Sequence, residues 1–213
     1  MKHKQIIWDF NGTLLDDVAE TLDATNAVLA RHGKPLLADA DAYRRVFGFP
    51  VIDYYEKIGL ERAHFEAYAD EWVAEYNRRA PQAGLYPCCR EALAYFRDAG
   101  CRQYLLSATE REMLAGQLAP LDIKSYFDDI VGQDDTRAHG KLAAAVEWSK
   151  KVKLYTALLV GDSLHDAEVA AAISADCVLL ACGHQSRARL EATGRRVFGT
   201  VAELLHAAEK GEL

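Results

Sequence analysis

The sequence predicts an α/β protein whose doubly wound, parallel-sheet core is interrupted after its first strand by an all-helical insert. Two observations support this prediction. From residue 85 onward, short apolar runs alternate with helical segments, which is typical of parallel βαβ units covered on both faces. Between residues 14 and 82 the apolar residues recur with helical spacing, and the sequence indicates no convincing strand there.

The first strand is the apolar run that begins at Gln5 and ends in Asp9, before a small polar turn containing Gly12. The insert follows, with helices expected at about 18–32, 38–47, 51–58 and 61–79. The last of these places four aromatic side chains on one face: Phe65, Tyr68, Trp72 and Tyr76. The insert is therefore expected to have an apolar core of its own.

The rest of the chain supplies the remaining core elements. Strands are expected at about 102–107, 129–131, 156–160 and 177–181. Helices are expected at about 88–99, 110–119, 140–151, 164–174, 186–193 and 200–210. This order predicts a sheet whose strands are joined by helical crossovers.

Composition narrows the class of protein. The chain has 213 residues, of which 50% are hydrophobic and 27% charged, with a formal net charge of −7. An acidic balance argues against broad contact with nucleic acid or an anionic membrane. With no signal-peptide pattern and no long apolar run, the sequence predicts a cytoplasmic protein. The cysteines have no metal-ligand spacing and are expected to be reduced thiols: Cys88, Cys89, Cys101, Cys177 and Cys182.

Two acidic strand ends indicate the chemistry. Asp9 ends the first strand, and Asp162 ends the strand at 156–160, with Asp166 at the start of the next helix. The carboxyl ends of parallel strands are where ligands bind in such sheets, and carboxylate oxygens suit Mg²⁺. Ser107 ends another apolar strand, and Lys141 opens a helix after Gly140. A helix cap alone explains one aspartate, but less well a second acidic strand end in the same sheet.

These residues resemble the four motifs of the haloacid dehalogenase superfamily, in the phosphoglycolate-phosphatase-like branch with a helical cap. The motifs occur in the family's order: Asp9-Phe10-Asn11-Gly12-Thr13, then Leu106-Ser107, then Lys141, then Gly161-Asp162-Ser163 with Asp166. The resemblance implies a Rossmann-like core formed by residues 1–15 and 84–213, and a cap domain formed by residues 16–83. Cap movement would then hinge near residues 15–18 and 80–86.

The resemblance implies a role for each motif residue. Asp9 would be the nucleophile that attacks phosphorus. A Mg²⁺ ion would be held by Asp9, the backbone carbonyl of Asn11, Asp162 and Asp166. Ser107 and Lys141 would bind phosphoryl oxygens, Lys141 being preferred over Lys150, Lys151 and Lys153, which look like a solvated helix end. Gly12, Thr13 and Ala108, which lie within or beside these motifs, are expected to contact the substrate.

Asn11 departs from the family pattern, which has a second aspartate at this position as general acid and base. An amide cannot exchange a proton at neutral pH, and such a loss typically costs about 10²–10⁴-fold in rate. Four interpretations remain. His165 supplies the proton or the leaving group needs none; a phosphonatase-like reaction uses Lys34 or Lys57; the protein binds phospho-ligands without turnover; or Asn11 was introduced or deamidates to Asp. The dehalogenase branch would place a tyrosine here.

The insert is expected to select the substrate, a small phosphorylated metabolite. Arg44 and Arg45 precede the turn-forming stretch Phe47-Gly48-Phe49-Pro50, and we expect these arginines and Phe47 to contact the substrate. The alternative is a helix end with solvated arginines. A second basic stretch reads as a solvated face, and comprises Arg187, Arg189, Arg195 and Arg196. Gly183-His184 follows a core strand and is a candidate for the pocket entrance. A monomer or a homodimer is expected.

Overall fold

The computed structural model describes residues 2–134 and 140–213, and its core is a parallel sheet of six strands. The strand order across the sheet is β5 (Asp129–Gln133), β4 (Arg102–Glu110), β1 (Gln5–Trp8), β6 (Ala157–Gly161), β7 (Asp176–Leu180) and β8 (Arg196–Phe198). Every neighbouring pair in this sheet is parallel. The predicted α/β fold class is confirmed.

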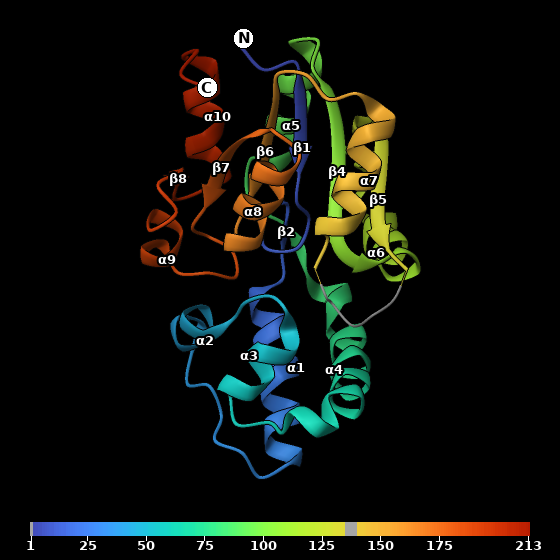
Figure 1. Ribbon diagram of the computed structural model, residues 1–213, viewed down its shortest axis with the longest axis vertical. Coiled ribbons are helices and arrows are strands. Elements are labelled where there is room, and N and C mark those ends of the chain that lie inside the picture. Colours follow the sequence, from blue (N-terminus) through green and yellow to red (C-terminus); the bar gives the residue numbers. More distant parts are fainter. Residues whose placement is uncertain (1, 135–139) are drawn as a thin grey trace.

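Helices cover both faces of the sheet (Figure 1). One face packs on α5 (Cys89–Asp98), α6 (Arg111–Leu118) and α10 (Val201–Glu209), and the other on α7 (Leu142–Val152), α8 (Leu164–Ala172) and α9 (Arg187–Glu191). Strand β1 contributes to both apolar layers, because successive side chains of a strand point to opposite faces of the sheet. Ile6 and Trp8 are buried in one apolar cluster, and Ile7 in the other. The central strand thereby anchors both layers.

The insert forms a separate layer of helices at the carboxyl ends of the strands (Figure 1). It consists of α1 (Val18–Arg31), α2 (Ala40–Val46), α3 (Val51–Lys57) and α4 (Phe65–Arg79), with a short 3₁₀ turn at Arg62–His64. A third apolar cluster lies within it, formed by buried residues between Val18 and Ala69. Three of the aromatic side chains expected on one face of the last helix are buried: Phe65, Tyr68 and Tyr76.

A two-stranded antiparallel ladder connects the insert to the core. Strand β2 (Leu15–Asp16) pairs with β3 (Gly84–Leu85), so the two chain crossings lie side by side. The expectation of no strand between residues 14 and 82 is therefore wrong at β2. The edge strand β8 also appears where the sequence suggested only a basic solvated stretch. Strands of two or three residues are too short to show a recognisable alternation.

Strand β4 runs to Glu110 rather than ending near Ser107. Its pairing with β5 shifts register between Leu106 and Glu110. Ser107 and Ala108 therefore lie in an irregular part of the strand rather than after it. Such an irregularity redirects side chains at the rim of a sheet, and here it accompanies the approach to the insert.

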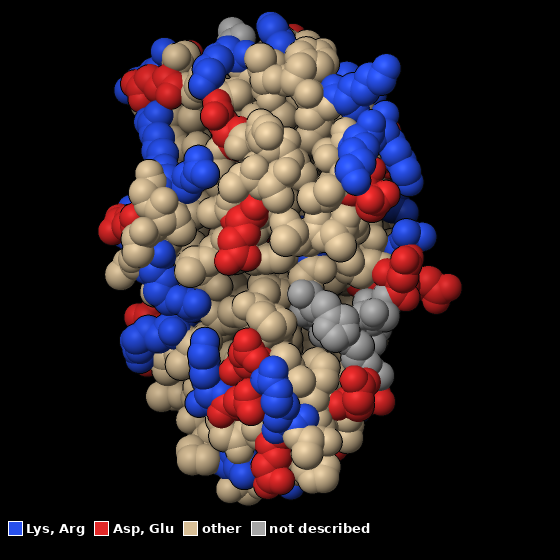
Figure 2. Space-filling model, viewed as in Figure 1, with Lys and Arg blue, Asp and Glu red and all other residues tan. Residues whose placement is uncertain are grey.

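No helix among residues 2–134 and 140–213 is both long enough and apolar enough to span a bilayer. Figure 2 shows that charged side chains of both signs are distributed over one face of the molecule, while much of its middle is uncharged.

An acidic side chain within the insert carries a testable pH dependence. Glu75 on α4 is buried and pairs with Arg78, Arg79 and Arg31, at 2.5 Å from Arg79 and 2.8 Å from Arg31. Hydrogen bonds from Arg78 and Arg79 lower the pKa of Glu75 from its usual 4.5 to about 2. A carboxyl whose pKa is lowered on folding stabilises the fold above its unfolded pKa and loses that contribution as pH falls.

We expect Glu75→Gln to lower the melting temperature at neutral pH by at least about 2 °C. For a chain of this length, a loss of about 1 kcal/mol of unfolding free energy shifts the melting temperature by about that much. The difference from the unmodified protein should shrink as pH falls from about 4.5 towards 2. Thermal unfolding followed by circular dichroism at a series of pH values measures this. Two melting curves that stay equally far apart at every pH would contradict it.

Candidate active site

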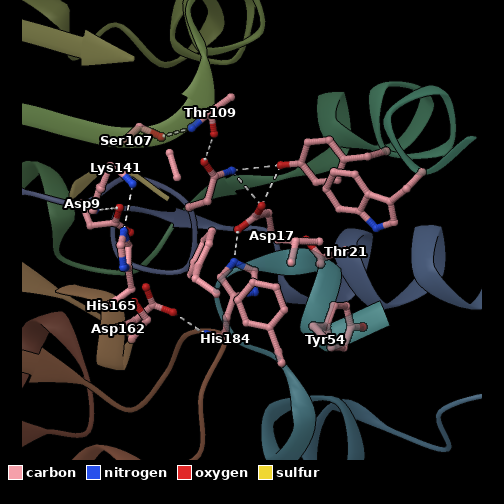
Figure 3. A pocket seen from close by; sticks show the side chains of 18 of the residues that line it. Asp9, Asp17, Thr21, Tyr54, Ser107, Thr109, Lys141, Asp162, His165 and His184 are labelled. Carbon is pink, nitrogen blue, oxygen red and sulfur yellow. Dashed lines mark hydrogen bonds and ion pairs between the residues drawn. The ribbon is translucent and has the colours of Figure 1, made fainter. Parts of the chain in front are cut away.

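A cavity of about 140 Å³ is lined by residues of the insert and by residues at the carboxyl ends of the core strands. Asp9 directly follows β1, and Asp162 directly follows β6, so adjacent strands deliver both carboxylates to it. Figure 3 shows Asp9, Lys141, Asp162 and His165 grouped on one side of this cavity, with Tyr54 and Thr21 from the insert on the other. The predicted convergence of the acidic strand ends is present.

Three buried aspartates form the centre of the site. Asp9, Asp162 and Asp166 each offer a carboxylate oxygen, and these oxygens lie within 4.8 Å of one another. Burial raises the pKa of Asp9 to about 8, reinforced by Asp166 and Asp162 and opposed by Lys141. Burial also raises the pKa of Asp162 to about 6. The protein alone thus carries more negative charge here than its one neighbouring lysine offsets.

Lys141 is the lysine at this centre. Its Nζ contacts Asp9 Oδ1, lies 2.7 Å from Asp166 Oδ1 and donates to the Leu106 carbonyl at 2.9 Å. Although burial opposes it, the carboxylates of Asp166 and Asp9 raise the pKa of Lys141 above its usual range. Lys150, Lys151 and Lys153 are exposed, and Lys150 pairs with Glu147. The preference for Lys141 agrees with this placement.

The start of α8 fixes Asp166. Ser163 and Asp166 form a reciprocal capping box, and Asp166 Oδ2 also accepts from the backbone N–H of Asp162 at 3.1 Å. Gly161 leaves room for that carboxyl, since a Cβ at this position would lie 2.2 Å from Asp166 Cγ. Burial raises the pKa of Asp166, but Lys141 outweighs burial and the net shift is downward. Asp166 is therefore an ionised, immobilised carboxylate.

Gly12 and Thr13 position the carboxylate of Asp162 and do not line the cavity. Gly12 has φ +74°, and a Cβ there would lie 2.5 Å from Asp162 Oδ2. Thr13 Oγ1 donates to Asp162 Oδ1 at 3.2 Å, and the His184 backbone N–H donates to Oδ2 at 2.5 Å. Neither Gly12 nor Thr13 lines the cavity, so the expected substrate contact is replaced by a positioning contact.

Asn11 is held by hydrogen bonds through both ends of its amide. Its Nδ2 donates to Asp17 Oδ2 at 2.9 Å and to the Tyr76 hydroxyl at 3.1 Å. Its Oδ1 accepts from Thr109 Oγ1 at 2.8 Å. A carboxylate in this place would face the Asp17 carboxylate instead of donating to it. The amide at position 11 and the carboxylate at position 17 are therefore complementary.

Asp17 is a functional residue that the sequence analysis missed. It is 1% exposed, lines the cavity, and accepts from the Gly12 N–H and the Tyr76 hydroxyl. His184 Nε2 lies 3.2 Å from Asp17 Oδ1, and Tyr43 OH lies 2.9 Å from His184 Nδ1. His184 lowers the pKa of Asp17 against the effect of burial, and Asp17 raises the pKa of His184 to about 9. The two form an ion pair that joins the insert to the core.

His165 lies in the buried wall of the cavity rather than on the surface. It is 8% exposed and lines the cavity, and its Nε2 accepts from the Lys141 backbone N–H at 2.8 Å. Its Nδ1 lies 3.2 Å from Glu168. Because Nε2 is an acceptor in this contact, His165 holds the start of α7 in place instead of presenting that nitrogen to a substrate.

The expected substrate contacts of the insert need correction. Arg44 does not line the cavity; its guanidinium donates to the carbonyls of Gly183 and Cys182 at 2.8 and 2.9 Å. Arg45 is exposed and also lies outside the cavity lining. Phe47 lines the cavity as expected, as do Ser107 and Ala108 from the core. The signal that misled the prediction was charge, which here serves to clamp α2 onto the loop after β7.

A family model described as haloacid dehalogenase-like hydrolase matches residues 6–180. The chain belongs to this family. A phosphoglycolate phosphatase of Pseudomonas syringae pv. tomato is 27% identical over 192 residues, covering 85% of this chain and 70% of the relative. A phosphoglycolate phosphatase of Mesorhizobium japonicum is 29% identical over 207 residues, covering 88% and 86% respectively.

The fold of this haloacid dehalogenase-like hydrolase is shared with solved structures. A haloacid dehalogenase-like family hydrolase from Streptococcus pneumoniae superimposes with a TM-score of 0.83 at 18% identity, covering 97% of this chain and 99% of that one. The resemblance to the phosphoglycolate-phosphatase-like branch, and with it a phosphatase or hydrolase activity, is confirmed.

Proposed function

We propose that this hydrolase is a Mg²⁺-dependent phosphatase that transfers the phosphoryl group of a small phosphorylated metabolite to Asp9. The observation that carries the proposal is the convergence of Asp9, Asp162 and Asp166 with Lys141 in one cavity. The named relatives are phosphoglycolate phosphatases, which supports the reaction class. The cytoplasmic location and the monomeric or homodimeric state stay predictions from the sequence.

The carboxylate centre fits a divalent cation. Its donor set is three buried carboxylates, a hard oxygen set of the kind that Mg²⁺ prefers, which lie within 4.8 Å of one another. Asp9, Asp162, Asp166 and the backbone carbonyl of Asn11 would hold the ion. Bound there, it would neutralise charge between the attacking carboxylate and the substrate phosphate.

Each residue of the centre has its own role in the two steps of the proposed reaction. A carboxylate oxygen of Asp9 attacks phosphorus, forming an O–P bond as the bond from phosphorus to the leaving oxygen breaks. Lys141 and Ser107 balance the charge of the transferred group. Water then attacks the aspartyl-phosphate, releasing phosphate and regenerating Asp9. We propose that residues 16–83 act as a cap that opens at residues 15–18 and 80–86 to admit substrate and release product.

Asn11 sets a condition on the leaving group. With an amide in place of the second aspartate, no carboxyl at this position protonates the departing oxygen or activates water. Asn11 also favours the rival function, a phospho-ligand-binding protein with slow turnover. The phosphonatase-like alternative has less support, because neither Lys34 nor Lys57 lies among the described residues that line the cavity.

Metal removal tests the proposed function. We expect chelation by EDTA to reduce phosphate release from acetyl phosphate to background, and added Mg²⁺ to restore it. Asp162→Asn should raise the Mg²⁺ concentration needed for half-maximal rate by about tenfold or more, because it removes one anionic donor. Asp98→Asn is the matched control, because the Asp98 side chain is exposed at the end of α5, and it should leave the metal dependence unchanged. Release that is indifferent to chelation would overturn the metal-dependent mechanism.

A further inference from the structure

Aromatic rings of the insert form a large part of the cavity lining. Phe47 lies 5.6 Å from Phe49 and 5.2 Å from Tyr54, measured between ring centroids. Phe49 in turn lies 5.0 Å from the ring of His165, so the aromatic wall extends to the core. The lining also includes further rings and apolar side chains, Tyr55, Phe65, Trp72 and Val73 from the insert and Met113 from α6.

The polar atoms of four of the rings that line the cavity, those of Tyr43, Tyr54, Trp72 and Tyr76, are engaged within the protein. The Tyr54 hydroxyl and Trp72 Nε1 both donate to Thr25 Oγ1, at 3.4 and 3.2 Å. The Tyr76 hydroxyl donates to Asp17 at 2.6 Å, and Tyr43 pairs with His184. The part of the lining that the insert contributes is therefore mainly ring faces and methyl groups, with Thr21 as a polar residue among them.

The described lining of the cavity, from residues 2–134 and 140–213, offers no free lysine or arginine for a second anionic group. Among its described lining residues the lysine is Lys141, which is paired with Asp9 and Asp166, and no arginine lines it. His184 is paired with Asp17. Burying an unpaired carboxylate or a set of hydroxyls against rings costs several kcal/mol. A substrate carboxylate of the phosphoglycolate kind has no partner here.

We propose that the organic part of the substrate is an uncharged aromatic ring joined to phosphate through a phenolic oxygen. The inference rests on the proposed function and names its substrate class. Rings packed at 5–6 Å from one another are suited to contact such a group edge-on or offset.

Asn11 independently favours a phenolic leaving group. In the first step the Asp9–phosphorus bond forms and the phosphorus–oxygen bond breaks, and the bonding electron pair leaves with the oxygen. A phenol has a pKa of about 10, so phenolate departs without a proton and takes one from water afterwards. An alkoxide is far more basic and needs the acid that Asn11 cannot provide. The aromatic lining and the amide of Asn11 thus favour the same class of substrate, a phosphate ester of a phenol.

Four substrates separate ring recognition from leaving-group ability. Phenyl phosphate has both, benzyl phosphate has the ring alone, acetyl phosphate has a good leaving group alone, and phosphoglycolate has neither. We expect kcat/KM for phenyl phosphate to exceed that for phosphoglycolate by about 100-fold or more. Benzyl phosphate should compete with phenyl phosphate at a similar concentration but turn over slowly. Acetyl phosphate should turn over with a high KM.

A variant of the wall completes the test. Phe49→Ala should lower kcat/KM for phenyl phosphate about tenfold relative to kcat/KM for acetyl phosphate in the same variant. Leu36→Ala, also in the insert but 57% exposed and outside the cavity lining, is the control and should change neither. Asp9-dependent release from acetyl phosphate, with phosphoglycolate equal to or better than phenyl phosphate, would overturn the substrate class and leave the proposed function standing. Release from none of the four would overturn the proposed function itself.

Discussion

Replacing Asp9 with Asn is expected to reduce phosphate release by about 10⁴-fold or more, the scale seen when a covalent nucleophile is removed. An amide oxygen is a poor nucleophile, and no other carboxylate in the described cavity directly follows β1. Lys141, Asp162 and Asp166 would keep their places, because each has further partners. The loss should therefore appear in turnover rather than in folding.

The same variant should fold at least as stably as the unmodified protein. Burial and two neighbouring carboxylates raise the pKa of Asp9, which means that the charged form is disfavoured in the folded state without a cation. A neutral amide of the same shape removes that repulsion, although it weakens the contact with Lys141. Thermal unfolding beside the phosphate assay measures both effects. Retained turnover in a folded Asp9→Asn protein would contradict Asp9 as nucleophile.

Replacing Asn11 with Asp is expected to have the opposite effect on slow substrates and to weaken the fold. The new carboxyl would lie where Asn11 Nδ2 now donates to Asp17 at 2.9 Å, so one of the two must take up a proton. A protonated carboxyl there is a general acid, and we expect benzyl phosphate turnover to rise by about 10²-fold, the lower end of such contributions. Disrupting the buried hydrogen bonds should cost about 1–3 kcal/mol of unfolding free energy.

A double-mutant cycle with Asp17→Asn tests the physical cause. Asn11→Asp combined with Asp17→Asn exchanges amide and carboxylate and restores one donor and one acceptor across the contact. We expect a favourable coupling of about 1–3 kcal/mol between the two changes, measured by denaturant unfolding. Additive destabilisation would mean that positions 11 and 17 do not depend on one another. Unchanged benzyl phosphate turnover in Asn11→Asp would mean that the missing acid does not limit the rate.

Much of the core could be predicted, because short stretches of sequence indicate its strands and helices. The apolar runs that end in Asp9 and Asp162 identify both their strands and their common edge, since parallel strands bring like ends together. Asp166, Ser107 and Lys141 also stand at strand ends or helix starts, and the order and spacing of the family's motifs gave weight to Ser107 and Lys141. Strand β8 and the β2–β3 ladder escaped prediction because two or three residues carry no periodicity.

The contacts between insert and core could not be predicted, because they join residues far apart in the chain. Asp17 meets His184 across 167 positions, and Arg44 reaches the Gly183 carbonyl across 139. A sequence signal for Asp17 existed in its position just after the first motif, but its charge alone suggested a helix start. Charge likewise suggested substrate contact for Arg44 and Arg45, whereas the uncharged rings beside them face the cavity.

The most direct test of the account is to identify the phosphorylated residue. The protein would be mixed with Mg²⁺ and phenyl phosphate, quenched in acid within its first turnovers, digested, and examined by mass spectrometry, with Asp9→Asn treated in parallel. We predict one added phosphoryl group on the peptide that contains Asp9, absent from the Asp9→Asn protein. Phosphate release during turnover without any phosphorylated Asp9, or a phosphoryl group on another residue, would contradict the mechanism.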